Sequence, residues 1–302
     1  MRNLLFIVAL TIVIALTAVM PARADGGRTN TPGVIPAVLT TQQKADNQHK
    51  VALARQTMSR QSTNGVQPLV SGGNAYANLY KEPQATYSLN WCGAGTATVL
   101  IAGWQIKTRG YDSIGQYSRY SNPYGAGYAW YSGGDAFMQH LAYDDQAVQD
   151  RATSAGITEP SRNAADDYSD ETHVASAANI ETASMTPWAN WYVVWQNMGS
   201  LSNFDTALYN DIANNSVPFS AVAAPAPGGG TLPLPGWSGA PSFMRHWLAV
   251  GSFDMPNDAI VYGDSAGTQQ AYGQDPWYWH NFTRSSFFDT YMLPYLNGAV
   301  VW

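Results

Sequence analysis

The chain of 302 residues has one cysteine, Cys92, and only 12% charged residues. A lone cysteine cannot form a disulfide framework within the chain. The sequence also lacks a phosphate-binding loop, a dinucleotide fingerprint, a zinc-ligand spacing and any internal repeat. We therefore expect no cofactor and no metal ion.

The first 24 residues have the pattern of a signal peptide. Arg2 supplies a positive start, residues 4–20 form an apolar run, and residues 22–24 (Ala-Arg-Ala) form a small-residue cleavage site. A membrane anchor is the alternative, but the run is short for a span and Pro21 follows it. We expect cleavage after residue 24, a secreted protein and no membrane attachment afterwards.

Basic residues are scarce in what remains. Removing residues 1–24 takes away two arginines and no acid, which leaves 13 basic and 21 acidic residues and a formal charge of −8. This balance argues against a nucleic-acid partner or an anionic membrane surface. The remaining length suffices for one large domain with an ample core, and we expect a monomer.

The composition divides the secreted chain into a leader and a domain. Residues 25–40 are rich in Gly, Thr and Pro and predict disorder, whereas residues 41–62 contain neither Gly nor Pro and predict a polar helix. We assign residues 25–77 to a leader, either a linker or a removable pro-segment. Residues 78–302 are assigned to the catalytic domain.

Cys92 heads a stretch without a polar stripe, which is typical of a buried helix. Asn90 or Cys92 itself is expected to cap that helix. Exported proteins normally pair their cysteines, so a lone secreted thiol suggests reactivity rather than structure. A small buried side chain is the alternative. A reactive thiol gains its nucleophilicity from a helix N-terminus and a neighbouring imidazolium.

His246 is the histidine best placed to supply that imidazolium. His246 directly precedes the apolar residues 247–251 within a strand predicted over residues 243–253. A second strand is predicted over residues 259–263. A hairpin centred on Met255 places His246 directly opposite Asp264, as an orienting carboxylate requires. A loop of even length would turn Asp264 to the other face. A core histidine with a hydrogen-bonded carboxylate is the alternative reading.

Acyl transfer also needs donors for the oxyanion that develops on the substrate. The backbone N–H of Cys92 is one candidate, and an upstream side-chain amide, from Gln84 or Asn90, is a second. The segment 224–241, rich in Pro and Gly, precedes His246. Long loops of this kind often act as lids, and we expect this one to cover the cleft.

Three motifs resemble the papain-like fold, and most of all the broad, non-transporter form of cysteine peptidase family thirty-nine. They are Trp91-Cys92-Gly93-Ala94, His246-Trp-Leu-Ala-Val-Gly251 and Val261-Tyr-Gly-Asp264. The resemblance spans residues 78–302 in order. It implies Cys92 as nucleophile, His246 as general base and acid, Asp264 as orienter and Gln84 as oxyanion donor. The family usually has Cys-Gly-Pro-Ala where this chain has Cys92-Gly93-Ala94-Gly95, and its Gln lies closer to the cysteine than Gln84 does.

These observations together predict an α+β, papain-like fold. A buried N-terminal helix carrying Cys92 would pack on an antiparallel sheet carrying His246 and Asp264. The predicted function is a secreted cysteine peptidase that acts on peptides or proteins. A cell-wall amidase or endopeptidase acting on peptidoglycan peptides, a transacylase with the same triad, and a binding module without turnover are the alternatives.

Overall fold

A computed structural model describes the parts of the chain that position the candidate site. It covers residues 34, 36–63, 72–77, 91–120, 130–143, 149–150, 167–240, 242, 244–265 and 279–302. All of them belong to one compact unit, Thr31–Trp302. Within these ranges no helix is both long and apolar enough to cross a bilayer. The predicted signal peptide, Gln84 and Asn90 lie outside the described residues.

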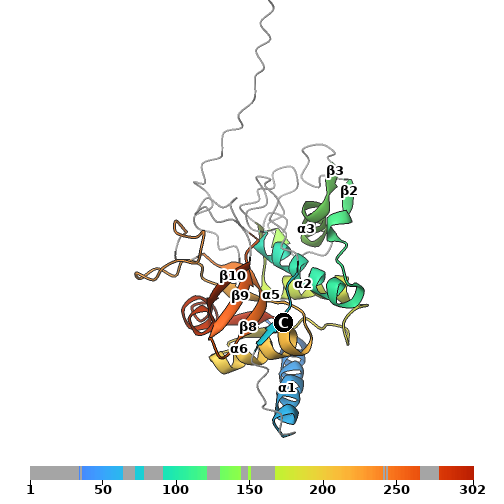
Figure 1. The fold of residues 1–302 in the computed structure, drawn as a ribbon. Helices are drawn as coiled ribbons and strands as arrows, with labels where there is room; N and C mark the ends of the chain where they lie inside the picture. Colours follow the sequence, from blue (N-terminus) through green and yellow to red (C-terminus); the bar gives the residue numbers. More distant parts are fainter. Residues whose placement is uncertain are drawn as a thin grey trace, which may run out of the picture. The chain divides into compact units, whose positions relative to one another are not determined.

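An antiparallel sheet forms the centre of the described fold (Figure 1). Its strand order is β10-β9-β8-β7-β11-β6, with β1 paired to β8. The strands are β1 (Gly72–Asn74), β6 (Val194–Gln196), β7 (Phe219–Ala223), β8 (His246–Asp254), β9 (Ala259–Gly263), β10 (Trp279–Thr283) and β11 (Ala299–Val301). Two short pairs join β2 (Ser118–Tyr120) to β3 (Trp130–Ser132) and β4 (Gln149–Asp150) to β5 (Asp167–Tyr168).

Helices precede, interrupt and follow these strands along the chain. The α-helices are α1 (Thr41–Thr63), α2 (Cys92–Arg109), α3 (Gly133–Tyr143), α5 (Glu171–Thr182), α6 (Leu201–Ala207) and α7 (Arg284–Ser286). Helices of other pitch are η1 (Ile114–Gln116), η3 (Leu208–Asn214) and η5 (Phe287–Met292). The polar helix predicted over residues 41–62 therefore coincides with α1 almost residue for residue.

The sheet is apolar on both faces because each face carries its own core. In β8, Trp247 and Ala249 belong to a cluster that includes residues of α2 and α5. Leu248 and Val250, which alternate with them, belong to a second cluster with residues of α6, η3 and η5. Successive side chains of a strand point to opposite faces, so an unbroken apolar run fits a strand covered on both sides. The predicted α+β architecture, a buried helix on an antiparallel sheet, is confirmed.

Helix α2 lies deep in the first of these cores. Every residue from Cys92 to Gln105 is buried, as predicted for a helix without a polar stripe. Gly110 ends the helix in the left-handed conformation, with φ 83°, and its N–H donates to the Ile106 carbonyl. Trp91 occupies the N-cap position and makes no side-chain capping hydrogen bond, so Cys92 is the first helical residue rather than the predicted cap, while Asn90 lies outside the described residues.

Helix α1 is anchored to the domain by a buried lysine. Lys50 is 1% exposed, and its Nζ lies 3.3 Å from Oδ1 of Asp211 in η3. Nζ also donates to the Trp191 carbonyl and lies 4.1 Å and 4.7 Å from the ring centroids of Trp191 and Trp302. Burial lowers the pKa of Lys50 from 10.5 to about 8, although Asp211 opposes the shift. The ammonium thus stays charged at neutral pH because of the carboxylate and the ring faces around it.

Candidate active site

Cys92 is the first residue of α2, and the start of this helix packs closely on neighbouring residues. The next residue, Gly93, packs so closely on the segment that leads into α5 that an added Cβ would lie 2.3 Å from the Ser169 hydroxyl oxygen. It would also lie 3.0 Å from a methyl group of Val174. Only glycine permits this approach at position 93. The start of α2, and with it the Cys92 sulfur, is therefore held against the start of α5.

His246 and Asp264 meet at one end of the sheet, beside Cys92. His246 is the first residue of β8, and Asp264 follows the last residue of β9. Nε2 of His246 lies 2.7 Å from Oδ1 of Asp264, and both residues are 3% exposed. The Cys92 thiol lies close enough to His246 to raise the pKa of its imidazole. Since Nε2 faces Asp264, Nδ1 is the ring nitrogen left for the sulfur.

The structure thus brings Cys92, His246 and Asp264 together, but the predicted strand register is wrong. Val250 pairs with Tyr262 rather than with Ile260. If this register is continued to His246, Asp264 lies two positions before the residue directly opposite His246. Residues offset by two on a neighbouring strand share a face and remain within reach of long side chains. His246 and Asp264 are diagonal rather than direct partners.

A bulge at Gly251 keeps the two side chains on one face. The pairing shifts between Val250 and Ser252, so Gly251 is an extra residue in β8. Without it, Asp264 would lie an odd number of positions from the site opposite His246 and would point to the other face. The sequence correctly predicted that His246 and Asp264 share a face of the sheet. The register nearer the turn differs from the predicted one by an odd number of residues, and the extra residue of the bulge makes the difference even at His246.

Gly251→Ala is expected to destabilise the protein by about 1–3 kcal/mol, the usual cost of overpacking. A Cβ at position 251 would lie 2.6 Å from the Trp279 ring, which covers the bulge. Gly115→Ala is the matched control, since nothing lies within 4 Å of a Cβ there. Urea unfolding measures both variants. Equal unfolding free energies for the two would show that the bulge tolerates a side chain.

The electrostatics of His246 are set by two opposing influences. Burial alone would lower the pKa of the imidazole. The charge of Asp264, its hydrogen bond to His246 and the nearby Cys92 thiol outweigh burial and raise the pKa of His246 well above its usual range. The surroundings of His246 therefore favour its imidazolium form.

Trp237 is a contact that the sequence analysis missed. Its Nε1–H donates to Oδ2 of Asp264 at 2.8 Å, and its ring centroid lies 4.5 Å from that of His246. The residue is 3% exposed. The segment 224–241 contains no other aromatic residue. A lone large ring among Pro and Gly could have indicated a buried contact there.

The oxyanion donors and any metal ligands are the other predicted features of the site. Gln84 and Asn90 lie outside the described residues, so the side-chain oxyanion donor stays a prediction. The first N–H groups of a helix have no acceptor within it, which keeps the Cys92 N–H a candidate donor. In the described part of the chain, no three His, Cys, Asp or Glu side chains are grouped to hold a metal ion.

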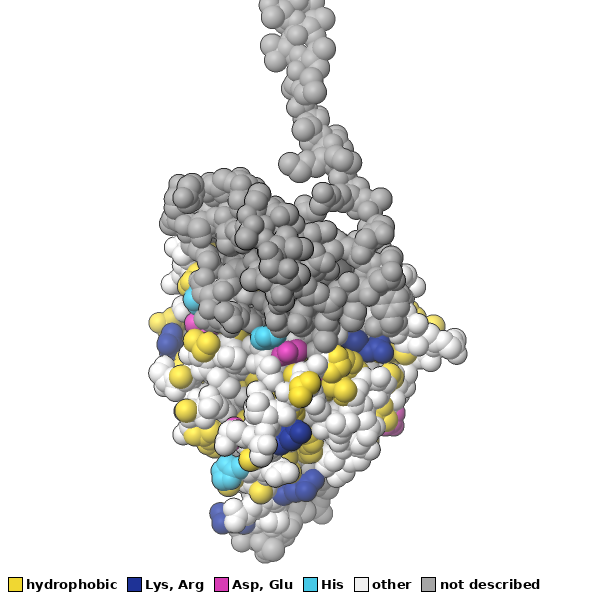
Figure 2. Space-filling view, turned by 180° about the vertical axis from the view of Figure 1, so that it is seen from behind, with side chains coloured by type: hydrophobic (Ala, Val, Ile, Leu, Met, Phe, Trp, Pro, Cys, Tyr) yellow, Lys and Arg dark blue, Asp and Glu magenta, His cyan; other side chains and the backbone are white. Residues whose placement is uncertain are grey.

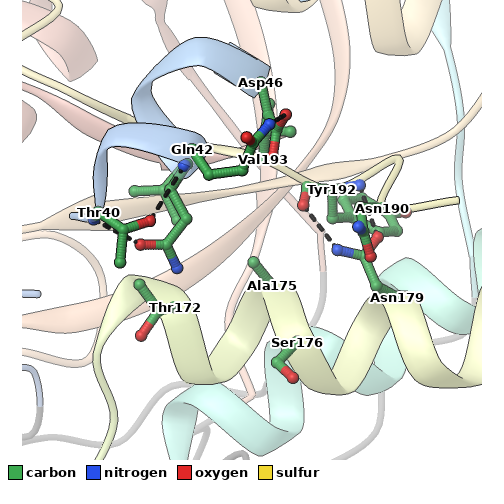
Figure 3. A pocket seen from close by; sticks show the side chains of 12 residues that line it. Thr40, Gln42, Asp46, Thr172, Ala175, Ser176, Asn179, Asn190, Tyr192 and Val193 are labelled. Carbon is green, nitrogen blue, oxygen red and sulfur yellow. Dashed lines mark hydrogen bonds between the residues drawn. The ribbon is translucent and has the colours of Figure 1, made fainter.

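A separate pocket of about 330 Å³ lies between the start of α1 and α5 (Figure 3). The Asn179 side chain donates to the Tyr192 carbonyl at 2.8 Å and accepts from the Tyr192 N–H at 2.7 Å. The Gln42 amide donates to Asp46 at 2.7 Å. These polar groups form hydrogen bonds with other residues that line the pocket. The pocket shares no residue with the cluster of Cys92, His246 and Asp264.

Comparison with solved structures gives a likeness of fold. No family model matches the chain. No curated protein matches it either. Among solved structures, it is similar to xylellain, a cysteine protease from Xylella fastidiosa, with a TM-score of 0.41 and 12% sequence identity. The match covers 91% of this chain and 96% of that one. The chemistry assigned to this site therefore rests on its own geometry.

Proposed function

We propose that this chain is a secreted, papain-like cysteine peptidase with Cys92 as nucleophile. The observation that carries the proposal is the buried contact chain from the Cys92 thiol through His246 to Asp264. Covalent acyl transfer requires a nucleophile within reach of a base, and a third group that orients the base.

The proposed reaction begins with an ion pair of the Cys92 thiolate and the His246 imidazolium. The sulfur attacks a peptide carbonyl, and the oxyanion that forms accepts a hydrogen bond from the Cys92 N–H and, as predicted, from Gln84. His246 then gives its proton to the leaving amine, which breaks the C–N bond and leaves an acyl-enzyme. Neutral His246 next takes a proton from water, whose oxygen attacks the thioester carbonyl. Cleavage of the C–S bond frees the acid and restores the Cys92 thiolate beside the His246 imidazolium.

Peptides and proteins are the proposed substrates, and secretion of the chain after loss of residues 1–24 is part of the proposal. Membership of family thirty-nine stays a prediction that rests on the three sequence motifs. The scarcity of basic residues disfavours a polyanionic substrate. On the face in Figure 2, the described Lys and Arg side chains are scattered among apolar and uncharged ones.

A labelling and digestion experiment tests the proposal. Iodoacetamide should modify Cys92 of the native protein faster than it modifies a free peptide thiol, and a peptide library should be cleaved. Cys92→Ala should abolish both reactions. Hydrolysis of purified peptidoglycan without cleavage of library peptides would favour a wall amidase. A Cys92 that reacts no faster than the free thiol, with no hydrolysis, would favour a binding module.

A further inference from the structure

The two oxygens of the Asp264 carboxylate have different partners from different parts of the fold. Oδ1 faces His246 at 2.7 Å, and Oδ2 accepts the Trp237 indole N–H at 2.8 Å. A carboxylate held at both oxygens cannot rotate about its last bond without losing one of these bonds. Trp237 therefore fixes the plane in which Asp264 meets the imidazole.

The Trp237 ring also covers the imidazole. The two ring centroids are 4.5 Å apart with an interplanar angle of 47°, and both residues are 3% exposed. Excluding water from an ion pair strengthens its electrostatic attraction. The titratable groups that act on His246 are Asp264, after β9, and Cys92, at the start of α2.

The segment that carries Trp237 is held by hydrogen bonds within the segment and by a contact with η5. The Leu234 N–H donates to the Pro225 carbonyl at 2.7 Å, and the Trp237 N–H donates to the Leu234 carbonyl at 3.0 Å. The Tyr291 hydroxyl, from η5, donates to the Leu232 carbonyl at 2.7 Å. Leu234 is 1% exposed, whereas the Leu232 side chain is 80% exposed. Only part of this segment faces solvent, and the part around Trp237 packs inward.

We propose that Trp237 is a positioning residue, whose N–H and ring hold the Asp264–His246 pair in the orientation that serves Cys92. The inference rests on the proposed function for its catalytic meaning, but the geometry it invokes can be tested without turnover. It also gives the Pro- and Gly-rich segment a role besides the predicted one of covering the cleft.

Two substitutions separate the N–H from the ring. Trp237→Phe keeps an aromatic cover and removes the donor, whereas Trp237→Leu removes both. The readouts are the NMR titration of the His246 ring and the pH profile of Cys92 alkylation by iodoacetamide. Trp188→Phe, at a tryptophan that is 37% exposed, is the control. Circular dichroism checks that each variant is folded.

In Trp237→Leu, water should screen Asp264 and lower the pKa of His246 by about one unit, so that the His246 titration and the step of the alkylation profile linked to it both move to lower pH by about one unit. Trp237→Phe should move both in the same direction by about half a unit, because a misaligned carboxylate supports the imidazolium less well. Well below that step both variants should react like the wild type. A purely structural role would lower stability without this pH dependence.

Folded variants whose titrations and alkylation profiles match those of Trp188→Phe would overturn the proposal. If the leucine variant does not fold, the phenylalanine variant decides by the same two readouts. A wild-type protein with the expected titration but no peptide cleavage would contradict the proposed function alone. The two failures are therefore distinguishable.

Discussion

His246→Ala is expected to lower peptide hydrolysis by about 10⁴-fold, the upper range for loss of a general acid–base group. The variant loses the imidazolium beside Cys92 and the proton for the leaving amine. Alkylation of Cys92 near pH 7 should slow with it, because the sulfur loses the cation that stabilises its thiolate. Initial rates on a cleaved library peptide and the iodoacetamide reaction measure the two effects.

The exposed His49, on α1, supplies the control, and His49→Ala should match the wild type in both assays.

Asp264→Asn tests the same site through the partner of His246. Without the carboxylate, burial is the dominant influence on His246 and lowers its pKa. The imidazolium would then be lost at lower pH, and the basic limb of the kcat/KM profile should move down. Wild-type rates in both His246→Ala and Asp264→Asn would refute the triad.

The sequence predicts the partners of this site better than it predicts how the chain joins them. The apolar run after Cys92 and the strand that His246 opens are local patterns, and both appear in the structure as α2 and β8. The register that relates His246 to Asp264 depends on the turn and on the bulge at Gly251. Periodicity alone cannot locate a bulge, since one extra residue leaves the apolar pattern of a doubly covered strand unchanged.

Trp237 and Lys50 escaped prediction for a different reason. Their roles depend on residues distant in sequence. Trp237 contacts Asp264, 27 positions later, and Lys50 contacts Asp211 and Trp302, which come far later in the chain. A lysine in a polar helix reads as solvated because charged residues are almost never buried without a partner. Only the tertiary fold brings the partner of Lys50 close, so no local sequence pattern predicts that this lysine is buried.

Lys50→Met is expected to destabilise the protein by about 3–5 kcal/mol, because it leaves the Asp211 carboxylate buried without its cation. The Asp211 side chain is fully buried, and one of its oxygens has no hydrogen-bond partner within the described part of the chain. Lys44→Met, at an exposed position of the same helix, should cost almost nothing. The double variant Lys50→Met with Asp211→Asn should recover much of the loss, since it removes both charges. Urea unfolding of the wild type, Lys50→Met, Asp211→Asn and the double variant gives this coupling energy.

The pH dependence of stability gives an independent test of the same pair. The pKa of Lys50 is about 8 in the folded protein and ordinarily 10.5, so between these values the unfolded chain binds more protons than the folded one. Stability attributable to Lys50 must therefore rise with pH in this window, by about 1–2 kcal/mol from pH 8 to pH 9.5. The buried tyrosines, whose pKa values are raised above 10, act only at higher pH. The deficit of Lys50→Met should accordingly widen across the window, whereas that of Lys44→Met should not.

These two measurements also bear on whether the leader is a linker or a removable pro-segment. Any cut that released α1 would leave Asp211 as Lys50→Met leaves it, and would also remove Asn47, which accepts a hydrogen bond from the Trp302 indole at 2.9 Å. We therefore expect proteolytic processing of the native protein to spare α1. A mature form that lacks residues 41–63 and remains as stable as the full chain would contradict the role assigned to Lys50, because the buried carboxylate would then need no cation.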